Sequence, residues 1–475
     1  MTLPRFIFSL VILLLASLQL QAGLRVGFSE VDITPRLDGP RPVFIAGYGQ
    51  NRRATGVHDK LWSRVTVLDD GHKKIALVSV DLVGLQYPAV LEIRKRLPEF
   101  DYLLVSSTHN HEGPDVVGLW GPTYIISGFD RAYYELLLDK IVESVRRAAA
   151  KTTRVVARYG TAQDDSLVND SRQPIVKDGV LRLISFHRRG RGRPVGMIVQ
   201  WNCHPESMGS RNTLLTADFT TPVVEHLRKE HGCPVLYVSG AVGGLMAPPR
   251  DRIHDSDGTL LKQGDFRYTE AYGYEVGRLA TRAYQAAESI KLTPLGVSAK
   301  RISLPVTNAM YKAARIAGVL ARPAYEWTGD PEKRGNPRPP QQLTGSMSVE
   351  TEVACLRLGE LPIVCVPGEI YPELVYGIYQ DPADPNADFP DAPLEPGLTT
   401  LLGQEKWMMF GLANDEIGYI IPRRQWDRLP PFAYGRNSSQ YGEINSCGPD
   451  TAPILMRMLR QVIETSQITR RPKDG

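Results

Sequence analysis

Short apolar runs rich in Val, Ile and Leu alternate along the chain with longer segments whose apolar residues recur every three or four positions. The short runs predict buried β-strands. They include residues 64–70, 74–84, 102–108, 181–187, 196–202, 234–240, 362–368 and 407–414. The longer segments predict helices over residues 87–97, 131–150, 221–231, 270–290 and 451–465. This alternation predicts an α/β fold with a mixed β-sheet core flanked by helices.

Three polar stretches rich in Gly or Pro interrupt the alternation, at residues 251–268, 325–345 and 380–397. They are expected to form irregular loops or lids. Long irregular loops in a compact domain are often functional. They are therefore candidates for substrate selection.

The N-terminal residues predict an export signal. Arg5 precedes an apolar run from Phe6 to Leu18, and a polar stretch ends at Ala22, which is the order of a secretory signal peptide. The run is shorter than the roughly 20 apolar residues that a membrane helix needs. We expect residues 1–22 to be removed and residues 23–475 to form a single secreted or periplasmic domain.

Composition excludes few functions. The net charge of +4 and the 23% of charged residues are ordinary for a globular protein and give no sign of nucleic-acid binding. Five cysteines are few for an exported chain, so disulfides do not define the fold. A turn near Glu360 would place Cys355 opposite Cys365 in a hairpin. Both a disulfide and two buried thiols are open there.

The segment LVSSTHNHEGPD places two histidines just after a predicted strand. In extended chain residues i and i+2 face the same side, so His109 and His111 are expected to project together. Strand ends are the usual place for sites in α/β proteins. The pair alone fits a metal site and two hydrogen-bonded loop histidines equally well.

Three further residues with ligand-type side chains follow apolar strands. His204 lies in NCHPES, Glu369 follows a Pro-Gly break in VPGE, and Tyr419 lies in GLANDEIGYI. Each alone has a plain structural explanation, such as a core histidine, a helix-capping glutamate or a packed tyrosine. Their shared position after strands favours one metal centre.

The chain resembles the neutral (alkaline, non-lysosomal) ceramidases over roughly residues 26–468. The resemblance is carried, in family order, by AGYGQNRRATGVHDKLWSR, STHNHEGP, NCHPESM, VPGE, GLANDEIGYI and YGEINSCGPDT. It implies a zinc amidase that splits the N-acyl amide of ceramide into sphingosine and fatty acid. A small-molecule or lipid substrate is expected on the same ground, and the basic run at residues 188–194 leaves transient contact with a membrane surface open.

The resemblance also assigns residues to roles. It implies that the zinc ligands are His109, His204, Glu369 and Tyr419, that His111 is the acid/base, that Tyr441 steadies the oxyanion, and that Arg172 matches a family arginine. Two imidazoles, a carboxylate and a phenol suit zinc.

Two departures from the family pattern concern the nucleophile and the C-terminus. Gly243 stands where the family has a nucleophilic serine, and Ala241 stands where it has an aspartate. The chain is also expected to lack the family's C-terminal immunoglobulin-like domain. We therefore expect cleavage of an N-acyl amide by metal-activated water. The alternatives are a zinc hydrolase for another amide, ester or glycoconjugate, and a non-catalytic binding protein.

Overall fold

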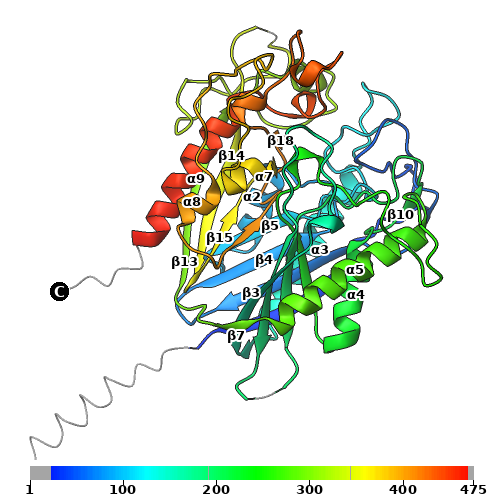
Figure 1. Ribbon diagram of the computed structural model, residues 1–475, viewed down its shortest axis with the longest axis vertical. Coiled ribbons are helices and arrows are strands. Elements are labelled where there is room, and N and C mark those ends of the chain that lie inside the picture. Colours follow the sequence, from blue (N-terminus) through cyan, green and yellow to red (C-terminus); the bar gives the residue numbers. More distant parts are fainter. Residues whose placement is uncertain (1–22, 191, 343, 469–475) are drawn as a thin grey trace, which may run out of the picture.

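The computed structural model describes residues 23–190, 192–342 and 344–468. The predicted signal peptide lies outside these residues. Three β-sheets surround a central apolar core, and each sheet has helices on its other face (Figure 1). This arrangement confirms the predicted α/β class with a mixed sheet core.

The first sheet has the strand order β5-β4-β3-β1-β6. Its strands are β1 (Arg25–Asp32), β3 (Trp62–Asp69), β4 (Lys74–Val80), β5 (Tyr102–Ser107) and β6 (Thr153–Arg154). Helices α2 (Tyr87–Arg96) and α3 (Arg131–Ala149) pack on it. Ile75 and Leu77 of β4 enter the central core, whereas Ala76 and Val78 face the helices. Burial of both faces explains the nearly continuous apolar run of β4.

The second sheet has the order β11-β9-β8-β7-β12. Its strands are β7 (Val156–Gln163), β8 (Val180–His187), β9 (Gly196–Trp201), β11 (Val235–Ser239) and β12 (Glu288–Ile290). Helices α4 (Thr220–His231) and α5 (Phe266–Gln285) cover its outer face. Helix α5 begins four residues before the predicted start, at Phe266, where Asp265 accepts a hydrogen bond from the amide of Arg267. It ends before residues 288–290, which pair with β7 instead of continuing the helix.

The third sheet has the order β13-β14-β15-β17. Its strands are β13 (Leu295–Pro305), β14 (Ser348–Leu358), β15 (Leu361–Cys365) and β17 (Met408–Phe410). Helix α9 (Thr451–Ile468) packs on it, and the shorter helices are α6 (Ala309–Ile316), α7 (Pro372–Tyr376) and α8 (Leu398–Leu402). Two small parallel pairs complete the described strands: β2 (Gly56–Val57) with β10 (Leu214–Leu215), and β16 (Glu369–Ile370) with β18 (Tyr419–Ile420).

The register of β14 and β15 corrects the expected cysteine arrangement. Ala354, not Cys355, is paired with Cys365. Neighbouring residues of a strand face opposite sides, so Cys355 joins the core under α9 and Cys365 joins the central core. All five cysteines are free and buried.

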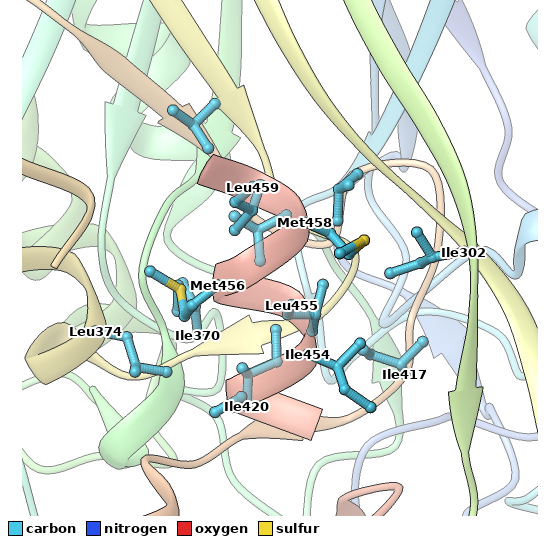
Figure 2. Packing of buried hydrophobic residues seen from close by; sticks show 14 of the residues in the cluster. Ile302, Ile370, Leu374, Ile417, Ile420, Ile454, Leu455, Met456, Met458 and Leu459 are labelled. Atoms are coloured by element: carbon cyan, nitrogen blue, oxygen red, sulfur yellow. The ribbon is translucent and has the colours of Figure 1, made fainter. Parts of the chain in front are cut away.

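Helix α9 packs against the two short strands β16 and β18, which carry the candidate residues Glu369 and Tyr419. Leu455 and Leu459 of α9 lie in one apolar cluster with Ile370, Ile417 and Ile420 (Figure 2). Ile370 and Ile420 directly follow Glu369 and Tyr419, and strand alternation turns the latter pair away from this cluster. None of the described helices is both long and apolar enough to cross a membrane.

Candidate metal centre

The candidate residues come together at the carboxyl ends of parallel strands. Strand β5 pairs in parallel with β4, β9 with β11, and β15 with β17. His109 follows β5, His204 follows β9, and Glu369 follows β15. The loop after β17 closes the gap, since Ser106 Oγ donates to the carbonyl of Gly411 and the amide of Gly411 donates to the carbonyl of Ser239. These bonds tie the end of β5 to the end of β11, the strand that pairs with β9.

His109 has a strained backbone and a fixed ring. Its φ of +65° lies in the left-handed region, which a non-glycine residue seldom adopts and which often marks a functional site. Nδ1 donates to the carbonyl of Val83 at 2.6 Å. The other ring nitrogen, Nε2, lies 3.3 Å from Glu369 Oε2.

His204 is held in the same way. Its Nδ1 donates to the carbonyl of Met246 at 2.8 Å, and its Nε2 lies 2.9 Å from Glu369 Oε2. Backbone carbonyls accept only, so both histidines carry a proton on Nδ1 and direct Nε2 towards the carboxylate. A carbonyl behind each imidazole is the support that metal-binding histidines commonly have.

Charge is concentrated around Glu369. Burial alone would raise the pKa of this carboxyl, but His109 and His204 outweigh burial and hold it well below its usual range. Burial likewise opposes the charged form of His204, yet the hydrogen bond to Glu369 raises its pKa to about 9. Without a metal the three groups therefore form an ion-paired cluster, whose protons a metal ion would have to displace.

His111 lies beside this cluster and keeps its ring nitrogens free. Its ring centroid is 4.9 Å from that of His109 and 5.6 Å from that of His204. Both ring nitrogens are buried and have no hydrogen-bond partner, and the nearest carboxylate oxygen, Glu206 Oε2, is 3.7 Å from Nδ1. Burial and the neighbouring imidazoles lower the pKa of His111 well below its usual value. A neutral imidazole is able to accept a proton.

Tyr419 lies next to Glu369 because β16 and β18 pair these two residues directly. Burial first, and then the charge of Glu369, raise the pKa of Tyr419 well above its usual value. Its ring packs edge-on against Tyr441, with 5.9 Å between centroids. The side chain of Tyr441 is half exposed, which places it at the solvent side of the centre. Tyr441 Oη accepts a hydrogen bond from Asn445.

Arg172 is buried, and both of its terminal guanidinium nitrogens donate hydrogen bonds to other parts of the protein. It forms a two-pronged ion pair with Glu443, at 2.7 and 3.0 Å, and donates to the backbone carbonyls of Tyr441 and Gln425 at 2.8 Å. Only its Nε lacks a partner. These contacts make Arg172 a residue that positions Tyr441.

Sequence reasoning missed three polar residues near the centre. Glu416 is grouped with His109 and Glu369 by the proximity of their ligand atoms. Glu206 accepts a hydrogen bond from the hydroxyl of Tyr48 at 3.0 Å and lies beside His111. The third missed residue is Tyr48. Glu206 and Glu416 lie inside the segments NCHPES and GLANDEIGYI, so a carboxylate next to a predicted ligand was the sequence feature that could have identified them as site residues.

The residues present fit a divalent metal ion. Two sets of ligand atoms lie within 4.8 Å of one another: His109, His111 and His204, and His109, Glu369 and Glu416. The ring nitrogens of His111 and Oε2 of Glu416 are buried and have no protein partner, so they are free to bind a cation. Imidazole and carboxylate donors suit zinc as well as other first-row ions.

Gly243, which stands where the resemblance places a serine, has no space for a side chain. A Cβ there would lie 2.4 Å from Tyr371 Cδ1 and 2.6 Å from the carbonyl carbon and oxygen of Ile370. Real Cβ atoms essentially never approach other atoms so closely. Strand β16 therefore occupies the volume that a residue-243 side chain would need.

Comparison with known proteins shows which proteins this chain is similar to. Residues 24–227 match the N-terminal part of the neutral/alkaline non-lysosomal ceramidase family. Over this part the chain is similar to the neutral ceramidases. It is 25% identical over 218 residues to the neutral ceramidase of Pseudomonas aeruginosa, and 25% identical over 324 residues to that of Mycobacterium tuberculosis.

The neutral ceramidase of P. aeruginosa also has the same fold. Its crystal structure superposes with a TM-score of 0.68 at 17% identity and covers 96% of this chain and 76% of that one. A solved ceramidase complexed with C2 superposes equally well. The two sequence matches cover 41% and 61% of this chain but only 32% and 49% of the two neutral ceramidases.

Proposed function

We propose that this chain is an exported zinc-dependent amidohydrolase of the ceramidase type, which cleaves the N-acyl amide of a ceramide-like lipid. The observation that carries the proposal is the convergence of His109 Nε2, His204 Nε2 and Glu369 Oε2 in a buried position, with each imidazole fixed from behind by a carbonyl. The relatives named as neutral ceramidases support the substrate class.

The roles of the chain's residues follow from their positions. His109, His204 and Glu369 would hold the ion together with Tyr419, and zinc supplies polarisation of a carbonyl oxygen when it is bound. His111 is the only histidine of the cluster whose ring nitrogens make no hydrogen bond. It would take the proton of the attacking water and return it to the leaving nitrogen. Tyr441 would donate to the developing oxyanion.

Hydrolysis without a serine nucleophile is favoured by the packing around Gly243. Because β16 fills the space there, no side chain at residue 243 could reach a substrate in this backbone arrangement. Ser239, the nearest serine before it, is also committed, since its hydroxyl donates to the carbonyl of Thr108 at 2.7 Å. This packing is equally compatible with cleavage of another ester, amide or glycoconjugate.

Metal analysis and a substrate panel test the proposal. Purified protein should contain one zinc ion per chain, and His109→Ala and His204→Ala should each lose it. His226→Ala, which changes a histidine that packs against α5, is the matched control and should keep it. N-acyl lipids, simple esters and glycoconjugates are then compared as substrates. Full zinc retention in both site variants would refute the ligand assignment. Selective cleavage of an ester would refute the proposal that the substrate is an N-acyl amide.

A further inference from the structure

Glu416 projects towards the metal centre from the loop between β17 and β18. One of its carboxylate oxygens lies within 4.8 Å of a ring nitrogen of His109 and of a carboxylate oxygen of Glu369. This residue belongs to no part of the ligand set that the family resemblance implies. The resemblance therefore does not explain why the Glu416 carboxylate lies at the metal centre.

The surrounding loop holds the Glu416 side chain in this direction. Its Oε1 accepts the amide of Gly418 at 2.7 Å. On the other side, a Cβ on Gly84 would lie 2.6 Å from Glu416 Cβ, so only glycine allows this approach. Gly84 directly follows Val83, whose carbonyl orients His109. One short segment thus positions both an imidazole and the second carboxylate.

The loop itself is anchored independently of the centre. Asp415 forms a buried ion pair with Arg322 and accepts the amide of Tyr87 at 3.1 Å. Asn414 accepts the amide of Val105 on β5 at 3.0 Å. Anchors on both preceding residues leave the Glu416 side chain little freedom to turn away from the centre.

The second oxygen of Glu416 has no protein partner. Its Oε2 is fully buried and accepts no hydrogen bond, and an unsatisfied buried acceptor is unfavourable. A carboxylate oxygen of Glu369 lies within 4.8 Å of one of the two Glu416 carboxylate oxygens. Two carboxylates this close are not both charged unless a cation lies near them; otherwise one of them takes up a proton.

We propose that Glu416 is a direct ligand of the metal ion held by His109, His204 and Glu369. This inference rests on the proposed function for the existence of the ion and adds a donor to it. The centre then offers two imidazoles and two carboxylates before Tyr419 is counted. A second carboxylate makes the donor set harder and more negative, which favours retention of a divalent first-row ion.

Metal affinity measured without substrate tests the proposal. Zinc is removed with a chelator and returned in competition with a chromophoric chelator, for wild type, Glu416→Gln and Glu416→Asp. Glu373→Gln is the matched control, because Glu373 Oε2, like Glu416 Oε2, is a buried atom without a partner, and burial raises the pKa of both carboxyls to about 8. Glu373 lies on α7 and in neither group of metal-type ligands found among the described residues.

Glu416→Gln should weaken zinc binding by at least about 10-fold, whereas Glu373→Gln should match wild type. Cobalt(II) in place of zinc should give an absorption spectrum in Glu416→Gln that indicates fewer ligands. Glu416→Asp keeps the charge but shortens the reach, so its affinity should also fall while thermal unfolding stays near wild type. This variant keeps the test valid if Glu416→Gln does not fold.

Two results would overturn the inference. One is an affinity of Glu416→Gln within about twofold of wild type, and the other is an unchanged cobalt spectrum, which would place Glu416 outside the coordination sphere. Wild-type protein that binds no metal at all would instead contradict the proposed function. The two failures are therefore distinguishable.

Discussion

Substitution of Gly243 tests the packing that separates this chain from a serine mechanism. In Gly243→Ala the new methyl group would meet Tyr371 at 2.4 Å and the backbone of Ile370 at 2.6 Å. Backbone atoms cannot turn aside as a flexible side chain can, so β16 must shift. Overpacking a filled core costs typically 1–3 kcal/mol, occasionally more. Because the clash is with backbone, we expect about 3 kcal/mol, a roughly 150-fold change in the folding equilibrium.

The shift should also reach the metal centre, because Ile370 directly follows Glu369. Gly243→Ala should therefore lose both stability and metal affinity, and Gly243→Ser should do the same without gaining an acyl-enzyme. Denaturant unfolding followed by the fluorescence of the six tryptophans gives the free energy. Gly39→Ala is the control, since nothing lies within 4 Å of its Cβ and its φ is not positive. An unfolding free energy for Gly243→Ala within about 0.5 kcal/mol of wild type would show that this reasoning is wrong.

Three further substitutions separate catalytic, positioning and structural roles. His111→Ala should keep zinc while activity falls by roughly 10²–10⁴, and loss of zinc in the elemental analysis would make His111 a ligand. Arg172→Lys keeps the charge but loses the two-pronged pair with Glu443, so it should lower stability by about 1–3 kcal/mol and speed proteolysis near residues 425–443. Unchanged proteolysis would argue against the positioning role. Glu352→Gln should cost about 3–5 kcal/mol because Glu352 is the buried partner of Arg94, and a cost below about 1 kcal/mol in denaturant unfolding would contradict it.

Glu352 also predicts the direction of acid sensitivity. Burial alone would raise the pKa of this carboxyl, but Arg94 and the hydroxyls of Tyr102 and Tyr87 outweigh burial and lower it. A lowered pKa stabilises the fold at pH values above the ordinary glutamate pKa, and that contribution is lost as pH falls through the lower folded-state value. Wild-type stability should therefore fall with decreasing pH below about 4.3, and Glu352→Gln should flatten this slope. An unchanged slope would contradict the assignment.

Periodicity predicted the elements whose burial is uniform. Strands such as β4 and β9 are apolar on both faces, and helices such as α3 and α9 carry one apolar stripe, so their sequences show their environments directly. Strand β13 was not among the strands predicted, because residues such as Ala299 and Arg301 are exposed while Ile302 and Leu304 are buried. The Cys355–Cys365 arrangement was misplaced by one residue, since hairpin register depends on turn geometry.

The site was predicted in a similarly uneven way. His109, His204 and Glu369 were found because each follows an apolar strand, and the carboxyl ends of such strands meet in space. Their proximity in the structure is consistent with that prediction, while their roles as ligands stay predictions. Arg172 shows the limit of assigning roles by matching residues to a family pattern. It matches a family arginine, but in the structure its guanidinium contacts Glu443 and two backbone carbonyls.

Glu416 shows why a ligand outside the expected pattern is hard to find from sequence. It neither follows a strand directly nor repeats at a recognisable spacing from another ligand. What allows it to approach the centre is the glycine at residue 84, which lies in the loop after β4 and far away in the chain. A close approach between one side chain and a distant glycine leaves no periodic signal. The number of carboxylates at such a centre therefore depends on tertiary packing, and the affinity of Glu416→Gln for zinc measures that packing directly.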